Sequence, residues 1–489
     1  MDNKYKEDHR PQFHFSPEAN WMNDPNGMVF FQGEYHLFYQ YYPDSTVWGP
    51  MHWGHAISKD LVHWQHLPIA LYPDDHGLIF SGSAVVDWNN TSGFGLNNQP
   101  PLVAMFSYHK MEGEKRGDID FQTQGIAYSN DKGRTWKKYD QNPVILNPGI
   151  KDFRDPKVIW HEASKHWIMV LAAGDHVKIY NSPNLKDWKH VSDFGHNVGS
   201  HDGVWECPDL FPLQGPDKEY WVLLQSMNPG NPNGGSGIQY FIGDFDGKNF
   251  MLDDRFKLLL EKQHSVWLDA GPDNYAGVTW SDIPIEDGRR IFLGWMSNWD
   301  YAQVVPTDKW RSVMTIPSEL TIEMIHGTPR IVVYPVEELD ELIGNNLSQI
   351  NKNEIYPLPN GLAQMNIFFE KPSSGKSGFK LFNNLGEYIE FYFNAEDNHF
   401  YFDRTKSGKD DFSNNFAKVH TVERLKRNRE IILQVFIDHS SIEIFIDDGV
   451  QLFSEIYFPR ENYNQIQFFE TGQKKASVKG SLESMEGIW

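Results

Sequence analysis

The chain has 489 residues, 40% hydrophobic and 22% charged, which is the composition of a globular protein and excludes a wholly disordered chain. Acidic residues outnumber basic ones 66 to 44, and the formal net charge of −22 repels phosphate backbones and anionic lipid headgroups. We therefore expect no nucleic-acid partner and no binding to a membrane surface. A neutral ligand is indifferent to this charge.

Cysteine content and the chain start bear on location. The single cysteine, Cys207, excludes an internal disulfide and a zinc site made of several cysteines. No apolar run approaches the roughly 18 residues of a membrane span, and the opening residues MDNKYKEDHRPQFHF lack the apolar region of a secretory signal. We expect a cytoplasmic protein, with the alternative that a native signal was removed and a Met added.

Short stretches of alternating hydrophobic and polar residues dominate the chain, and turn residues bound each of them. This pattern is typical of β-strands, as is the aromatic content of 15%. Long helical periodicity is nearly absent, and the clearest helix covers residues 336–343, where Gly344 can end it. The clearest strands lie at residues 35–41 (YHLFYQY), 167–171 (WIMVL), 220–224 (YWVLL) and 290–296 (RIFLGWM).

A degenerate repeat runs through the first two thirds of the chain. Each copy is a strand, a polar turn and an aromatic residue that opens the next strand. The copies lie at residues 57–67, 128–139, 180–191 and 242–252, and their aromatics are Trp64, Trp136, Trp188 and Phe250. Four-stranded units at intervals of about 50–70 residues indicate the blades of a β-propeller. Ordinary β-hairpins with an aromatic at the strand start are the alternative.

The pattern changes after residue 334. Residues 335–355 are polar, include the predicted helix and form a linker in this interpretation. Residues 431–438 and 441–447 then alternate cleanly around a turn (DHSS), which is typical of a sandwich of two sheets. The sequence therefore predicts an all-β protein, with a propeller over residues 1–334 and a β-sandwich over residues 356–489.

Three carboxylates stand in unusual turn sequences. Asp24 and Asp155 each precede a proline, which forces an extended backbone, and Arg154 lies beside Asp155. Glu206 lies between Trp205 and Cys207 in an apolar strand segment, where glutamate is disfavoured. Taken singly, each is explained as a turn aspartate bonded to its own backbone or as a glutamate at a strand end facing water.

Together the three carboxylates indicate a chemistry. The innermost strands of a propeller converge on one axial channel, so carboxylates at their ends can meet. Paired carboxylates perform glycoside hydrolysis, one as the acid and one as the nucleophile or base. Nearby aromatics offer stacking faces for sugar rings, although blade core explains any one of them: Trp48, Trp53, Tyr275, Trp295 and Trp299.

Metal and cofactor chemistry is not indicated. His52 and His55 lie three apart, but in a strand such positions point to opposite faces. Neither a glycine-rich phosphate loop nor a G-x-S-x-G motif occurs in the sequence. We expect neither a metal nor another cofactor.

At these carboxylates the chain resembles glycoside hydrolase family 32, which holds invertases, inulinases and levanases. The resemblance rests on WMNDPNG at residues 21–27, FRDP at 153–156 and WECPD at 205–209, in the family's order. It extends to FSGSA at 80–84, GPDNYA at 271–276 and VFIDHSSIEIFIDDG at 435–449, so it covers essentially the whole chain.

The resemblance implies a five-bladed propeller joined to a sandwich, and hydrolysis of terminal β-D-fructofuranosides with retention of configuration. It implies Asp24 as the nucleophile, Glu206 as the general acid/base and Asp155 as the stabiliser of the transition state. Arg154 would lie beside Asp155 in the same subsite and hold it ionised. Further positions implied for substrate binding are Asn23, Gln40, Trp48, Phe80, Ser81, Tyr275 and Trp295.

Several alternatives stay open. Residues 295–320 resemble the exo-acting branch of the family, but a fructosyltransferase would carry the same triad. A sucrose-6-phosphate hydrolase would need a basic pocket, which the sequence does not locate. A non-catalytic sugar-binding propeller would be expected to lack a carboxylate. The sandwich is interpreted as a packing or dimerisation domain, with a carbohydrate-binding module as the alternative. Cys207 is interpreted as a small buried core residue rather than a residue that tunes the pKa of Glu206.

Overall fold

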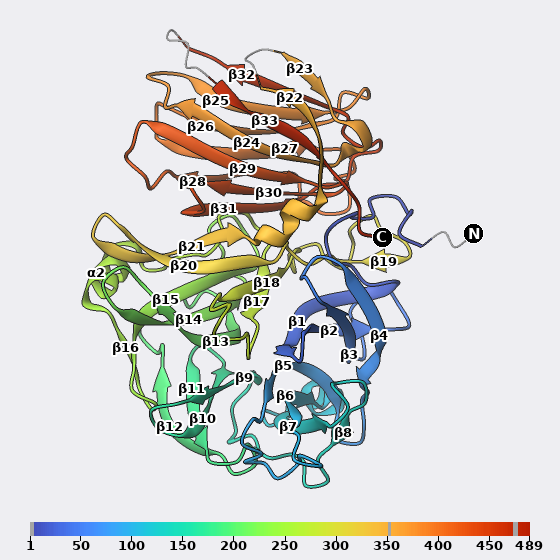
Figure 1. Ribbon diagram of the computed structural model, residues 1–489, viewed down its shortest axis with the longest axis vertical. Coiled ribbons are helices and arrows are strands. Elements are labelled where there is room, and N and C mark those ends of the chain that lie inside the picture. Colours follow the sequence, from blue (N-terminus) through green and yellow to red (C-terminus); the bar gives the residue numbers. More distant parts are fainter. Residues whose placement is uncertain (1–3, 351–353, 473–477) are drawn as a thin grey trace.

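The computed structural model describes residues 4–350, 354–472 and 478–489. It confirms the all-β prediction and its two parts, a five-bladed propeller and a sandwich of two six-stranded sheets (Figure 1). Both termini lie near the junction of the two parts in this view. Within the described ranges, the helices are too short and too polar to cross a lipid bilayer.

Each blade is an antiparallel sheet whose first strand lies innermost. Blade 1 contains β1 (Asn20–Phe31), β2 (Glu34–Tyr42), β3 (His52–Ser58) and β4 (Trp64–Leu71), and the short β19 (Trp310–Arg311) pairs parallel to β1. Blade 2 contains β5 (Leu78–Val86), β6 (Leu102–His109), β7 (Gln122–Ser129) and β8 (Lys137–Lys138). Blade 3 contains β9 (Phe153–His161), β10 (His166–Ala173), β11 (Val177–Ser182) and β12 (Lys189–Phe194).

The last two blades complete the ring. Blade 4 contains β13 (Val204–Gln214), β14 (Glu219–Asn228), β15 (Gly237–Phe245) and β16 (Phe250–Leu252). Blade 5 contains β17 (Tyr275–Thr279), β18 (Ile291–Trp295), β20 (Ser318–Ile325) and β21 (Thr328–Pro335). The inner strands β1, β5, β9, β13 and β17 contact one another in turn, and β17 closes on β1 around the centre in Figure 1.

The repeat seen in the sequence is the outer hairpin of a blade. Its four copies join β3 to β4, β7 to β8, β11 to β12 and β15 to β16. Trp64 and Phe250 open the outermost strand, and Trp136 and Trp188 directly precede it. The repeat therefore marks successive blades, as predicted.

The sandwich packs two sheets face to face around its own hydrophobic core. One sheet contains β22 (Ile343–Gln349), β33 (Val478–Met485), β24 (Ala363–Glu370), β29 (Glu430–Ile437), β30 (Ser441–Ile446) and β31 (Gln451–Ile456). The other contains β23 (Ile355–Pro357), β32 (Gln465–Glu470), β25 (Lys376–Phe382), β26 (Tyr388–Asn394), β27 (His399–Lys406) and β28 (Val419–Glu423).

The predicted linker differs in the structure. Its helix is a 3₁₀-helix, η1 (Glu337–Leu342), and the chain enters β22 at Ile343, so Gly344 does not end the helix. Residues 343–349 pair with β33 and belong to the sandwich sheet, because pairing there satisfies their backbone N–H and C=O groups. Residues 351–353 of the predicted linker lie outside the described residues.

The sequence patterns also missed two helices. The first, α1 (Met111–Arg116), follows β6, and the second, α2 (Asp254–Gln263), follows β16. Asp253 caps α2, because its carboxylate accepts the N–H groups of Arg255 and Phe256. A further 3₁₀-helix, η2, covers Pro359–Gly361.

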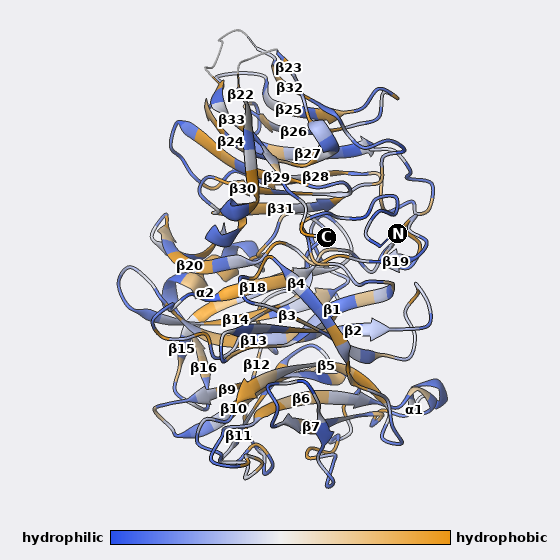
Figure 2. Ribbon diagram, turned by 45° about the vertical axis from the view of Figure 1, so that its right-hand side comes forward, coloured by the Kyte–Doolittle hydropathy of each residue, from blue (hydrophilic) through white to orange (hydrophobic). Residues whose placement is uncertain are grey.

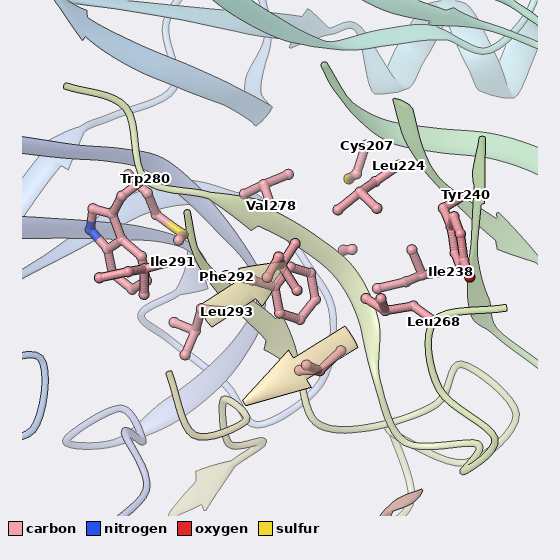
Figure 3. Packing of buried hydrophobic residues seen from close by; sticks show 14 of the residues in the cluster. Cys207, Leu224, Ile238, Tyr240, Leu268, Val278, Trp280, Ile291, Phe292 and Leu293 are labelled. Atoms are coloured by element: carbon pink, nitrogen blue, oxygen red, sulfur yellow. The ribbon is translucent and has the colours of Figure 1, made fainter. Parts of the chain in front are cut away.

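Hydrophobic residues hold neighbouring blades together. Figure 3 shows such packing between blades 4 and 5, where Leu224 and Ile238 lie near Val278 and Phe292. Cys207 belongs to the same cluster and is buried, in agreement with the prediction that it is a small core residue. In Figure 2, strands such as β5 and β18 are largely hydrophobic and the connecting loops are largely hydrophilic.

A register break interrupts every inner strand. It falls between Met22 and Pro25 in β1, Ile79 and Gly82 in β5, Arg154 and Lys157 in β9, Glu206 and Asp209 in β13, and Tyr275 and Val278 in β17. Breaks of this kind bend a strand and redirect its side chains. The three sequence motifs coincide with three of these breaks, so the breaks place the motif residues at the axis.

Candidate active site

A pocket of about 240 Å³ lies where the inner strands begin. It brings together residues from all five blades, which are far apart in the sequence. The predicted residues that line it are Asn23, Asp24, Gln40, Trp48, Phe80, Ser81, Arg154, Asp155 and Glu206. The axial convergence expected from the propeller therefore places all three carboxylates in one pocket.

Asp24 lies in the register break of β1, where its carboxylate accepts several hydrogen bonds. Asn23 Nδ2 donates to Oδ1 over 2.9 Å, and Ser81 Oγ donates to Oδ2 over 2.5 Å. Burial raises the pKa of Asp24 above its ordinary value, the Ser81 hydrogen bond opposes this rise, and the charge of Glu206 adds to it. The donors favour the carboxylate form that a nucleophile needs.

Asp155 is almost fully buried and adopts a backbone φ of 66°, which is rare for a residue other than glycine. Its N–H donates to Ser107 Oγ over 2.9 Å, which fixes this part of the break in β9. Burial raises the pKa of Asp155 to about 7, although Arg154 opposes the rise.

Cys207 joins two of the carboxylates. Its N–H donates to Asp155 Oδ2 over 3.1 Å, and its Sγ lies 3.6 Å from that oxygen and 3.5 Å from Asp24 Oδ2. Burial raises the pKa of the Cys207 thiol well above its ordinary value, so the thiol keeps its proton. Cys207 is thus both a core residue and a contact of the carboxylates.

Glu206 is held by two donors from neighbouring blades. Arg154 Nη2 donates to Oε1 over 2.6 Å, and the Tyr275 hydroxyl donates to Oε2. Arg154 also donates to Asp152 over 2.7 Å, but its Nε lies 3.8 Å from Asp155. Arg154 therefore lies beside Asp155, as predicted, and its charge acts to lower the pKa of Asp155, but its shortest hydrogen bonds go to Glu206 and Asp152.

Tyr275 and Trp295 do not line the pocket, although both were predicted to contact substrate. Tyr275 is 1% exposed and its hydroxyl donates to Glu206, while Trp295 is fully buried and packs against Trp299. The ring centroids of Trp295 and Trp299 lie 5.0 Å apart, and Trp299 lines the pocket. The last tryptophan of the segment WMSNW thus faces the pocket in place of the first.

Family models agree with this arrangement over nearly the whole chain. The model described as Glycosyl hydrolases family 32 N-terminal domain matches residues 14–335. The model described as Glycosyl hydrolases family 32 C terminal matches residues 338–486. The chain belongs to glycoside hydrolase family 32.

Individual relatives show the same similarity. The chain is 47% identical to a levanase of Bacillus subtilis over 99% of this chain and 72% of that protein. It is 37% identical to an extracellular exo-inulinase of Aspergillus niger over 99% of this chain and 96% of that protein. The crystal structure of an exo-inulinase from Aspergillus awamori superposes with a TM-score of 0.89 at 34% identity, covering 99% of this chain and all of that one. The protein is a glycoside hydrolase of the β-fructosidase type.

The pocket of this family 32 enzyme also contains residues that the sequence analysis did not name: His109, Glu114, Gln122, Asp152 and Gln303. Trp299, which was named as a possible stacking aromatic, lines the pocket too. Trp299 and Gln303 lie inside residues 295–320, which resemble the family, and Asp152 directly precedes the motif FRDP at 153–156, so these segments held a signal for them. His109, Glu114 and Gln122 lie in or next to β6, α1 and β7, and no motif marks them.

His109 and Gln122 support the pocket wall. The His109 ring stacks on Phe80 with centroids 4.1 Å apart, and its two nitrogens contact Glu114 and Gln122 at 3.1 Å each. Gln122 in turn accepts the N–H of Phe153 over 2.8 Å. Burial lowers the pKa of His109 to about 4, so the imidazole is neutral near pH 7.

Side chains able to ligate a metal also occur outside the pocket. Among the described residues, Asp175, His176 and His196 place one ligand atom each within 4.8 Å of one another. They are partly exposed, and the two imidazole rings stack with centroids 4.0 Å apart. The expectation that the enzyme needs no metal stays a prediction.

Proposed function

We propose that this enzyme removes single fructose units from the non-reducing ends of sucrose, fructo-oligosaccharides and fructans, with retention of configuration. The main support for this proposal is that Asp24, Asp155 and Glu206 share one small pocket lined by both aromatic and hydrogen-bonding side chains. The levanase and exo-inulinase relatives support this choice of substrates.

The first step forms a fructosyl-enzyme ester. Glu206 donates a proton to the glycosidic oxygen as the bond from that oxygen to the anomeric carbon breaks. Asp24 Oδ1 or Oδ2 bonds to the anomeric carbon, and the leaving sugar departs as an alcohol. Asp155 stabilises the positive charge that develops on the fructose ring, because its carboxylate lies in the same buried site.

The second step returns the enzyme to its initial state. Glu206 takes a proton from water, the water oxygen bonds to the anomeric carbon, and the ester bond to Asp24 breaks. Two displacements at one carbon retain its configuration. Arg154 and Tyr275 orient Glu206 in both steps, because each donates to a different carboxylate oxygen.

Pocket size supports exo action. Its volume of about 240 Å³ is below the usual range of roughly 300–1,000 Å³ for pockets that enclose a drug-sized ligand. Such a pocket suits one sugar ring rather than an internal segment of a chain. Trp48 and Phe80, whose rings meet edge to face at 6.0 Å, line it as apolar walls.

The charges of the pocket favour a neutral substrate. Its lining contains five carboxylates, those of Asp24, Glu114, Asp152, Asp155 and Glu206. Arg154 is the one Lys or Arg among its described lining residues, and it is paired with Glu206 and Asp152. A phosphorylated sugar would meet net repulsion here, which disfavours sucrose-6-phosphate.

A time course of products from sucrose, 1-kestose, inulin and levan tests the proposal. We expect fructose as the released unit from the start, without intermediate oligomers. Longer fructans made from sucrose would identify a fructosyltransferase instead, and a ladder of oligomers from polymer would identify endo action. The Asp24→Asn variant is the control for contaminating activity.

Location and assembly stay predictions from the sequence. A cytoplasmic enzyme would meet sucrose and imported oligosaccharides rather than polymer, so the relative rates on these substrates also bear on location. A homodimer formed through the sandwich stays a prediction, and the mass of the protein in solution tests it.

A further inference from the structure

A second cavity lies at the opposite end of the propeller axis. The catalytic residues stand at the starts of the inner strands, whereas this cavity is lined by residues farther along them, such as Val86 of β5, Lys157 of β9 and Thr279 of β17. Its volume is about 500 Å³, twice that of the catalytic pocket. Between the two, Pro25, Pro156 and Pro208 line a gap of only about 10 Å³. The cavities are therefore separate sites.

Tryptophan side chains from different blades line this second cavity. They are Trp88, Trp160, Trp167 and Trp221. Trp88 is 59% exposed, yet its Nε1 donates to Asp282 over 2.8 Å, and Trp160 Nε1 donates to Glu162 over 2.7 Å. Hydrogen bonds at the indole edge hold these rings while apolar surface stays open. Exposed aromatic surface is unfavourable in water, so a ligand that covers it is stabilised. The apolar faces of sugar rings can cover such surface.

Polar atoms without partners also line the cavity. Asp209 is fully buried, and its Oδ2 accepts the N–H and the hydroxyl of Thr279 at 2.6 and 2.8 Å. Its Oδ1 has no hydrogen-bond partner among the described residues, and the same holds for Ser281 Oγ and Arg290 Nε. Because unpaired buried polar atoms cost free energy, these atoms call for a hydrogen-bonding ligand. They offer one acceptor, one donor and one hydroxyl that can do either.

The charged side chains that line the cavity are two cations, Lys157 and Arg290, and four carboxylates, those of Glu162, Asp209, Glu219 and Asp282. Lys157 Nζ lies 3.2 Å from Asp209 Oδ2, and Arg290 lies among the carboxylates of Asp209 and Asp282. Glu162 is paired with Lys165 and with the Trp160 indole, and the excess of carboxylates disfavours an anionic ligand. Open indole surface, unpaired hydrogen-bonding atoms and repulsion of anions together suit a neutral, polyhydroxylated ligand.

We propose that this cavity is a second, non-catalytic binding site for a neutral oligosaccharide. It would hold a chain on the enzyme while the separate catalytic pocket processes an end. The chemistry admits either a fructan or another neutral glycan, and the proposal does not depend on the catalytic roles assigned above. Structural water alone in the cavity is the competing explanation.

Binding stoichiometry tests the proposal on the full-length chain. The Asp24→Asn variant is titrated calorimetrically with 1-kestose and, separately, with maltotriose, and both titrations are repeated with fructose saturating the catalytic pocket. We expect one binding event for at least one trisaccharide that persists under saturating fructose. A preference for 1-kestose identifies a fructan site, and a preference for maltotriose identifies a glucan site.

Variants then locate the persistent event. Adding Trp88→Ala should weaken it by about tenfold or more, since stacking of one ring contributes on this scale. Trp160→Ala should weaken it too, whereas Tyr72→Ala, which removes an exposed aromatic outside the cavity, should not. Unchanged kcat on sucrose for Trp88→Ala in the otherwise native chain verifies folding. Loss of all trisaccharide binding under saturating fructose, or persistent binding unaffected by both tryptophan variants, overturns the proposal.

Discussion

The hydroxyl of Tyr275, at the start of β17, donates a hydrogen bond to Oε2 of Glu206 on β13. Arg154 of β9 donates to the other oxygen, so three blades converge on one carboxyl group. Contacts from the two neighbouring blades, rather than from its own strand, therefore fix the orientation of the Glu206 side chain.

Tyr275→Phe removes that hydrogen bond without removing the ring. We expect kcat on sucrose to fall about 10–100-fold with little change in KM, because Glu206 loses orientation rather than substrate contact. The loss should be smaller for a fructoside with an activated leaving group. A larger rise in KM than fall in kcat would mean that Tyr275 acts on substrate binding instead.

Asp24→Asn should lower kcat by about 10³-fold or more, since an amide cannot form the ester intermediate. The amide oxygen can still accept from Asn23, and the amide NH2 can donate to the Ser81 hydroxyl oxygen, so the fold should be kept. Steady-state rates and thermal denaturation, measured side by side, check both parts. Near-normal kcat in a folded variant contradicts the nucleophile assignment.

Glu206→Gln should slow natural substrates by about 10²–10⁴-fold, the usual contribution of general acid–base catalysis. Formation of the ester from an activated aryl fructoside should suffer less, because a good leaving group needs no proton. Rates on sucrose and on the aryl fructoside distinguish the roles. An equal loss on both would argue against Glu206 as the acid.

Asp155→Asn should change how stability depends on pH. Burial raises the pKa of Asp155 to about 7 in the folded chain, well above that of an exposed aspartate, so the folded state binds this proton more tightly than the unfolded state. The stabilisation is complete at low pH and is lost as the pH rises through about 7. Asparagine stays neutral, so the variant should gain stability relative to the parent as the pH rises from about 4 to about 7 and keep that gain at higher pH. Denaturation midpoints at several pH values measure this, and a difference independent of pH contradicts it.

Arg404→Met tests how the sandwich supports the propeller. Arg404 is fully buried, and its Nη1 lies 2.6 Å from Asp273 of the propeller and 3.0 Å from Glu455 of the sandwich. Its removal leaves two buried carboxylates without their cation, and we expect a loss of about 3–5 kcal/mol in the free energy of unfolding.

The matched control is Arg429→Met. Arg429 pairs with Glu370 on the surface, where both side chains are more than half exposed, and loss of such a pair should change stability by at most about 1 kcal/mol. Urea denaturation compares the two variants. Because Asp273 lies two residues before Tyr275, kcat of Arg404→Met on sucrose also reports whether this junction positions Glu206. Equal stability of both variants would contradict the role of the junction.

Local patterns predicted the strands well, because a two-residue period and bounding turn residues are properties of short segments. The strands at residues 35–41, 167–171 and 220–224 lie within β2, β10 and β14. The helix at 336–343 became a 3₁₀-helix followed by β22, because pairing with β33 outweighed a weak helical preference. Helix α2 was missed because its position beside β15 and β21, rather than its periodicity, decides its burial.

The sequence by itself determined the all-β class, the repeat of the blades, the family and the three carboxylates, since each depends on residues that lie close together in the chain. Only the tertiary structure decided that Arg154 hydrogen-bonds Glu206 while it lies beside Asp155. It also decided that Trp299 lines the pocket instead of Trp295, and that His109 and Gln122 support the pocket wall. These contacts join separate blades. The register breaks and the packing of the blades set their distances, and no local sequence pattern encodes a distance between strands so far apart along the chain.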